Sequence, residues 1–174
     1  MRSRMTPPPS LIDSLGRHIH YVRISVTDRC DLRCVYCMAE DMTFVPRSDV
    51  LRIEEIARLS ALFVAHGVTK IRLTGGEPLV RKGIVEIAQH LGSLSRLDTL
   101  AMTTNGTRLT EFAAPLKQAG VTHLNISLDS LDAKRFHAMT RTGHLDDVLR
   151  GIAAAQGAGF RSIKLNTVVL KQRN

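Results

Sequence analysis

The sequence lacks several features that would point to common functions. It has no tryptophan, and aromatic residues make up only 4% of its 174 residues, which argues against a surface that stacks the bases of single-stranded nucleic acid. We therefore expect no nucleic-acid partner. No uncharged stretch reaches the roughly 18 residues that a membrane span needs, so we expect no membrane partner. The only three cysteines fall within eight residues, which does not suit a secreted disulfide framework and predicts a cytoplasmic location.

Positive charge predominates in what the sequence does contain. There are 24 Lys and Arg against 16 Asp and Glu, a formal net charge of +8 that predicts an anionic partner. The length suits a single domain with a single core. Residues 1–10 contain three consecutive prolines and no apolar segment, so they are interpreted as a disordered tail and not as a signal peptide. Residues 11–174 are expected to form the domain.

An internal repeat predicts the fold. Three times, a helical pattern ends at a glycine that is followed by a short bridge and an alternating strand, in segments 67–74, 120–127 and 159–166. Two further strands are expected over Tyr21–Val26 and Thr99–Thr103. Between the strands lie helices whose apolar faces contain Ile53, Ile56, Leu59 and Phe63, then Ile84, Ile87 and Leu91, then Val148, Ile152 and Ala155. The alternation βαβαβαβαβ predicts an α/β fold with a parallel sheet.

One face of the expected sheet is polar, whereas a parallel sheet covered on both faces would be almost wholly apolar. This face contains Arg23, Ser25, Lys70, Arg72, Thr74, His123, Asn125, Ser127, Lys164 and Asn166. It either lines a wet cavity in a partial barrel or is the solvated side of an open sheet. The polar residues gather toward the carboxyl ends of the strands, where α/β proteins bind ligands, which favours the cavity. Arg23, Arg72 and Lys164 have no matching carboxylate on these strands and predict a site for a phosphorylated substrate.

Cys30, Cys34 and Cys37 form a C-x3-C-x2-C loop immediately after the first expected strand. Three thiolates at this spacing can bind three irons of a [4Fe–4S] cluster, and without a fourth cysteine the fourth iron stays open to a ligand. Structural zinc would need a fourth ligand, and His18 and His20 lie upstream at no familiar spacing. A chance grouping, or one disulfide with one free thiol, is the remaining alternative. The pattern favours the iron–sulfur cluster.

The cysteine loop resembles that of the radical S-adenosylmethionine (SAM) enzymes, and Leu73-Thr-Gly-Gly-Glu-Pro78 resembles their glycine-rich segment. Further motifs are similar to one family of that superfamily, the GTP 3′,8-cyclases of molybdenum-cofactor biosynthesis. They are Arg23-Ile-Ser-Val-Thr-Asp-Arg-Cys30, Arg72-Leu-Thr-Gly-Gly-Glu-Pro78, Thr103-Thr-Asn-Gly106, Asn125-Ile-Ser-Leu-Asp-Ser130 and Lys164-Leu-Asn-Thr167. The resemblance implies a partial (βα) barrel. It also implies an enzyme that uses a 5′-deoxyadenosyl radical to convert GTP into a 3′,8-cyclised nucleotide.

The resemblance also implies roles for individual residues. Cys30, Cys34 and Cys37 would bind the cluster; Tyr36, Gly76 and Ser127 would contact SAM; Arg23, Arg72, Thr103 and Lys164 would contact GTP. No side-chain base is implied, because the cofactors carry the chemistry. A reductant is required, and family members can be homodimers. Competing interpretations are that Tyr36 covers the cluster, Ser127 caps a helix, Thr103 lies in a turn, and Arg72 and Lys164 are solvated charges.

The sequence departs from the family in length. Members are about twice as long and contain a second cysteine triad, which binds a second [4Fe–4S] cluster near the guanine, and this sequence has none. We therefore expect a barrel truncated after the fifth strand, with cyclisation uncoupled from SAM cleavage or lost. The alternatives are another radical SAM enzyme that acts on a phosphorylated or peptide substrate, and a non-enzymatic metal-binding module.

Overall fold

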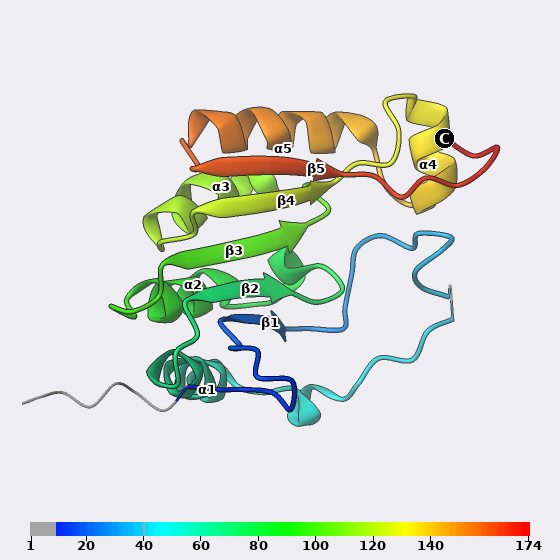
Figure 1. The fold of residues 1–174 in the computed structure, drawn as a ribbon. Coiled ribbons are helices and arrows are strands. Elements are labelled where there is room, and N and C mark those ends of the chain that lie inside the picture. Colours follow the sequence, from blue (N-terminus) through cyan, green and yellow to red (C-terminus); the bar gives the residue numbers. More distant parts are fainter. Residues whose placement is uncertain (1–9, 40) are drawn as a thin grey trace, which may run out of the picture.

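The computed structural model describes residues 10–39 and 41–174 and contains one five-stranded parallel sheet. The strands pair in chain order, β1-β2-β3-β4-β5, so each strand lies beside the one that precedes it in the sequence (Figure 1). Their bounds are Tyr21–Ser25, Lys70–Thr74, Thr99–Thr104, His123–Ser127 and Ser162–Asn166. The predicted α/β fold is confirmed, and β1 ends one residue earlier than expected.

Most of the helices pack on one side of the sheet and leave the other side uncovered, whereas α4 (Ala133–Thr140) lies beyond the carboxyl ends of the strands (Figure 1). The α-helices are α1 (Ile53–Ala65), α2 (Ile84–Gly92), α3 (Leu109–Gln118), α4 (Ala133–Thr140) and α5 (Leu145–Gly157). Two short 3-10 helices, η1 (Arg47–Asp49) and η2 (Pro78–Val80), lie in the connections. Within residues 10–39 and 41–174, no helix is long and apolar enough to cross a bilayer.

The three repeated glycines end their helices as predicted. Gly67, Gly120 and Gly159 have φ values of 96°, 94° and 72°, the left-handed region in which an L side chain is strained. Each follows the last helical residue by two positions, after α1, α3 and α5 respectively. The chain then turns back into the next parallel strand. This local signal is why the repeat could be read from the sequence.

Alternating side chains give the sheet one apolar and one polar face. In β2 and β4 the apolar residues Ile71, Leu73, Leu124 and Ile126 are fully buried under the helices, and the polar residues between them are half-buried. The expected burial fails in β5, where Leu165 is 54% exposed. The reason is that β5 is an edge strand, which within the described residues pairs only with β4.

Two further details differ from the expectation or refine it. The connection from β4 to β5 holds two helices, α4 and α5, and not the single predicted one. Asp132 caps α4 by accepting a hydrogen bond from the Arg135 N–H at 2.9 Å, so Ser127 does not do so. The expected tail over 1–10 lies, except for Ser10, outside the described residues.

Candidate functional site

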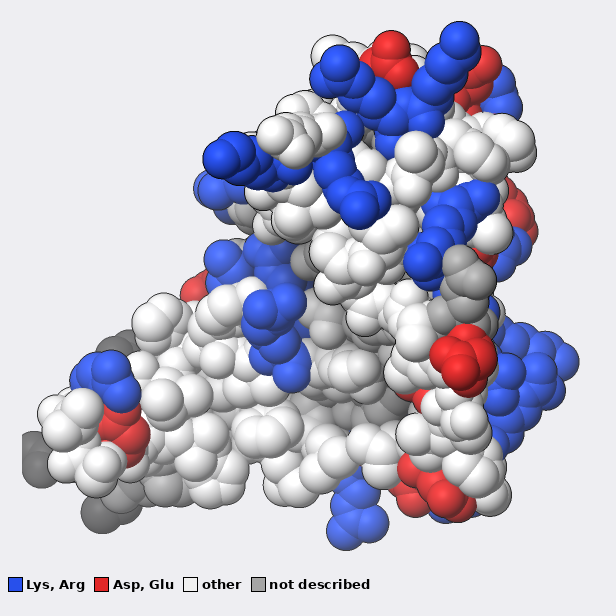
Figure 2. Space-filling view, turned by 90° about the vertical axis from the view of Figure 1, so that its right-hand side faces the viewer, with Lys and Arg blue, Asp and Glu red and all other residues white. Residues whose placement is uncertain are grey.

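Figure 2 views the molecule from the side toward which the strands run; the surface is hollowed there, and Lys and Arg gather mainly above the hollow and to its right. A cavity of about 280 Å³ opens there, between the cysteine loop and the strand ends. Its lining contains eight of the ten predicted site residues: Arg23, Cys30, Cys34, Tyr36, Cys37, Gly76, Thr103 and Ser127. Arg72 and Lys164 are not part of it. One pocket thus unites the three cysteines with residues from β1 to β4.

The cysteine loop presents three free thiols. The Cys30 sulfur accepts hydrogen bonds from the Leu32 N–H at 3.4 Å and from the Asn105 side chain at 3.9 Å. Burial raises the pKa of Cys30 to about 12, so this side chain is a neutral thiol at pH 7. Among the described residues, no three His, Cys, Asp or Glu side chains are close enough to hold a single metal ion.

Asp31 ties this loop to the end of β3. One carboxylate oxygen accepts from the Asn105 side-chain amide and the other from the Thr107 hydroxyl, both at 2.7 Å. The Asp31 carbonyl accepts from the Thr142 hydroxyl at 2.9 Å. The sequence reasoning named Asn105 only as motif-like and missed Asp31, because the two residues are 74 positions apart.

Glu77 lies beneath these contacts and is only 1% exposed. It accepts hydrogen bonds from the Leu79 N–H, the Thr104 hydroxyl and the Asn105 N–H at 3.0, 2.7 and 2.6 Å. Burial raises the pKa of Glu77 to about 7, although the three donors act in the opposite direction. Glu77 thereby fixes the backbone from which the Asn105 side chain reaches Asp31.

Gly76 allows the start of the cysteine loop to lie against the end of β2. Its N–H donates to the Thr27 carbonyl at 2.8 Å, and a Cβ at this position would lie 2.4 Å from the Arg29 carbonyl oxygen. Such an approach is impossible for any residue with a side chain. The glycine is therefore required by backbone packing, and it also leaves the pocket wall free of a side chain at this point.

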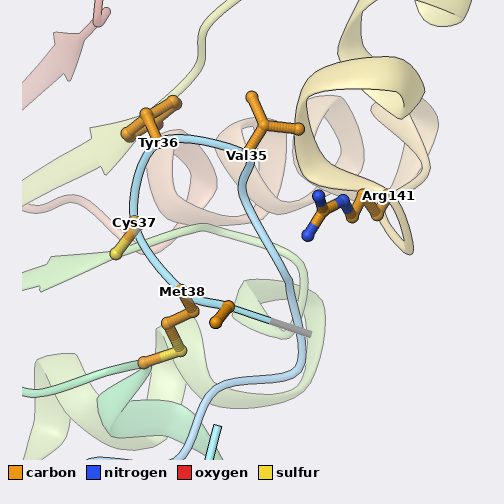
Figure 3. Close-up of a pocket in the computed structure, with 6 residues that line it drawn as sticks. Val35, Tyr36, Cys37, Met38 and Arg141 are labelled. Atoms are coloured by element: carbon orange, nitrogen blue, oxygen red, sulfur yellow. The ribbon is translucent and has the colours of Figure 1, made fainter. Parts of the chain in front are cut away.

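Tyr36 lies between two of the cysteines and is 40% exposed. Its hydroxyl donates to the Asp129 carboxylate at 2.5 Å, and burial together with this carboxylate raises the pKa of Tyr36. On the outer side of the loop, a second cavity of about 560 Å³ borders α4. Figure 3 shows Val35 and the Arg141 guanidinium turned toward this outer space, whereas the Cys37 sulfur points away from Arg141. The loop is therefore open on its outer side.

Cations line the polar face beyond the pocket. Arg23 and Arg72 are register partners on neighbouring strands, so these like charges lie side by side. Arg72 donates to the Thr103 hydroxyl at 3.2 Å and to the Tyr21 hydroxyl at 2.8 Å. Thr103 lies inside β3 and not in a turn. Among the described residues, no carboxylate forms an ion pair with either arginine.

His123 and Lys164 place further basic side chains on the same face of the sheet. Lys164 on β5 is exposed and pairs in register with Asn125. Partial burial and the positive charges of Lys70, Arg161, Arg72 and Lys164 hold the pKa of His123 below its usual value. These four cations therefore create a positive field around His123, a residue that the sequence reasoning placed on this face without a role.

Comparison with known proteins identifies the superfamily. The sequence profile of the Radical SAM superfamily matches residues 24–174. The chain belongs to this superfamily. The radical SAM chain is 63% identical to GTP 3′,8-cyclase 1 of Pseudomonas aeruginosa over 163 residues, which cover 94% of this chain and 50% of that protein. It is 62% identical to the GTP 3′,8-cyclase of Marinobacter nauticus, with 97% and 51% covered. The chain thus spans about half the length of the curated relatives it matches.

Solved structures share the fold of this radical SAM chain. Streptococcus suis SuiB bound to S-adenosylmethionine superposes with a TM-score of 0.71 at 20% identity, over 88% of this chain and 35% of that one. HydG, a maturase of the [FeFe]-hydrogenase, gives 0.66 at 16% identity, with 85% and 34% covered. The predicted partial-barrel fold is thereby confirmed.

Membership of the radical SAM superfamily implies a [4Fe–4S] cluster and SAM, and the donor set fits such a cluster. All three thiols come from one loop and face one cavity. The Cys30 sulfur already accepts two N–H groups, the kind of contact that surrounds cluster sulfurs.

Proposed function

We propose that this chain carries the part of a GTP 3′,8-cyclase that binds and cleaves SAM, with GTP as the substrate. The proposal is supported above all by the shared cavity, in which Cys30, Cys34 and Cys37 meet Gly76 and Ser127. It is supported further by two relatives of that name, more than 60% identical over nearly the whole chain.

In this proposal the cysteines hold the cluster, which when bound supplies the electron that splits a carbon–sulfur bond of SAM. Gly76, whose N–H is bonded to Thr27, offers its carbonyl to SAM without an intervening Cβ. Ser127 offers a hydroxyl from the end of β4, and Tyr36 forms a wall beside the cluster. A small reductant can reach the loop from its outer side, which the second cavity leaves open.

Arg23, Arg72, Thr103 and Lys164 are proposed to hold GTP. Arg23 and Thr103 line the cavity. Arg72 lies outside it and donates a hydrogen bond to Thr103. Arg23 is exposed and Arg72 is half-buried, and the two like charges lie side by side on neighbouring strands. Among the described residues no carboxylate pairs with them, so they form a positive site that a triphosphate complements. The nucleotide would then extend from the row of cations toward the SAM pocket, with its ribose nearer the cysteines.

The test uses the chain after anaerobic reconstitution with iron and sulfide. With dithionite and SAM it should release 5′-deoxyadenosine, and GTP should bind without the cluster. With GTP deuterated at the ribose 3′ carbon, mass spectrometry of the 5′-deoxyadenosine reports whether the hydrogen comes from GTP. Because the chain spans half of the relatives' length, we expect cleavage without cyclised product.

Two outcomes would replace this proposal. If the chain takes up zinc in preference to iron and lacks the visible absorption of an iron–sulfur cluster, it is a non-enzymatic metal-binding module. Release of 5′-deoxyadenosine by a chain with no affinity for GTP would indicate a radical SAM enzyme with another substrate, such as a peptide.

A further inference from the structure

The buried carboxylate of Asp129 joins three segments that are distant in the sequence. Asp129 follows β4 and is 5% exposed. One of its oxygens accepts from the Tyr36 hydroxyl at 2.5 Å, and the other accepts from the Val168 N–H at 2.9 Å. The cysteine loop, the end of β4 and the segment after β5 therefore meet at one side chain.

We propose that Asp129 is a positioning residue for SAM: its carboxylate holds the Tyr36 phenol in place as a wall of the pocket that receives the nucleoside part of SAM. This inference rests on the proposed function. Asp129 and Tyr36 both line the cavity that contains Gly76 and Ser127, so the contact between them forms part of the pocket wall.

The need for such a contact follows from where Tyr36 lies. Its ring is 40% exposed and stands on a loop without regular secondary structure, so packing alone leaves it free to change rotamer. A hydrogen bond from a hydroxyl to a buried carboxylate is short and strong, and here it fixes the far end of the ring. A ring held in this way loses little further freedom when a ligand stacks against it.

Asp129 itself is held rigidly enough to act as the anchor. With both oxygens hydrogen-bonded, its buried carboxylate is fully satisfied. Its backbone carbonyl accepts from the Asn174 side chain at 2.7 Å, and the neighbouring Leu128 carbonyl accepts from the Thr167 hydroxyl at 2.7 Å. The anchor is thus held by the segment that follows β5, and the tyrosine that it holds belongs to the cysteine loop.

The test is a double-mutant cycle on the affinity for SAM, measured by equilibrium dialysis with the reconstituted chain. Tyr36→Phe and Asp129→Asn should each raise the Kd about tenfold, roughly the effect of one hydrogen bond to a charged group. The double variant should bind as weakly as either single variant and no more so. Asp132→Ala is the matched control: it removes the cap of α4 three residues away and should leave the Kd unchanged.

A second readout needs neither cluster nor SAM. The chain has two tyrosines and no tryptophan, so its ultraviolet emission comes from tyrosine alone. Asp129→Asn should change the emission of the metal-free chain at neutral pH and should change nothing in the Tyr36→Phe background.

Several results would overturn the inference. Full additivity of the two substitutions would mean that Asp129 contacts SAM itself and does not act through Tyr36. An unchanged Kd in Tyr36→Phe would also overturn the inference. This variant keeps the aromatic ring, and its result does not depend on whether Asp129→Asn folds. A wild-type chain that takes up iron and sulfide yet binds no SAM would overturn the proposed function as well.

Discussion

The two ends of the sheet's polar face differ in how their charged side chains are satisfied. At the carboxyl end, Asp31, Glu77 and Asp129 each have hydrogen bonds to both carboxylate oxygens, all from groups of the protein. Farther back, Arg23 and Arg72 lie side by side, and no carboxylate among the described residues pairs with them. The first region has its hydrogen bonds without any ligand, whereas under the proposed function the second region is completed by a bound anion. The following predictions test this difference.

The largest effect is expected in the prebuilt region, at the cysteine loop. Cys34→Ser should abolish cluster formation, because the chain has no other cysteine to replace the lost ligand. Wild-type chain reconstituted anaerobically should contain about four irons and four sulfides, measured by chemical analysis and visible absorption. Ser48→Ala, in the exposed connection after the loop, is the control. About eight irons per wild-type chain would contradict the single site.

Glu77 makes the stability of the same region dependent on pH. Its pKa is about 7 in the folded chain against the ordinary 4.5, so the folded state keeps a proton that the unfolded state has released. Stability from this group is fully present below pH 4.5 and is lost as the pH rises to 7, on the order of 3 kcal/mol. Urea unfolding at pH 4.5 and at pH 7.5 measures how much the free energy of unfolding falls between these two pH values. The fall should be larger in wild type than in Glu77→Gln. Glu86→Gln, at an exposed position, should show the same fall as wild type. An equal fall in Glu77→Gln and wild type would exclude the effect.

Much of this region's framework was predictable from the sequence, but its contacts were not. Gly67, Gly120 and Gly159 act locally on the backbone, so the strand and helix order followed from spacing alone. The contact between Tyr36 and Asp129 spans 93 residues, and no periodic pattern predicts which polar side chains meet at that distance. Alternation placed Leu165 on the apolar face but could not show that an edge strand leaves it uncovered.

In the second region, around Arg23 and Arg72, we expect substitutions to have smaller effects, and to affect GTP binding more than SAM binding. Arg72→Ala and Lys164→Ala should each weaken GTP binding by roughly 1.5–3 kcal/mol, the range for a hydrogen bond to a charged group. SAM affinity should change little, because neither residue lines the cavity. Calorimetry with both ligands measures this, with Arg58→Ala on α1 as the control. Equal losses for GTP and SAM would mean that the sheet itself is disturbed.

The smallest effect concerns His123. Partial burial and then the surrounding cations hold the pKa of His123 below its usual value, and a bound triphosphate would offset the field of the cations and raise that pKa. GTP binding near pH 6 should therefore take up a fraction of a proton and should tighten as the pH falls below 6.5. Calorimetry in two buffers of different ionisation enthalpy measures the uptake. His123→Gln should remove it; a wild-type heat independent of buffer would exclude the linkage.

The order of the strands has a consequence for how the chain is made. Because β1 to β5 pair in chain order, each strand after β1 is synthesised when the preceding strand of its pair already exists, and assembly can follow synthesis. The cysteine loop comes early, but its anchors Asn105 and Asp129 come 75 and 93 residues after the loop residues that they bond, Cys30 and Tyr36. The contacts that support the loop are therefore complete only after the segments that contain Thr142 and Val168 have been synthesised. Iron inserted before that stage would meet a loop without its supporting contacts, so cluster assembly on the finished sheet is the favoured order.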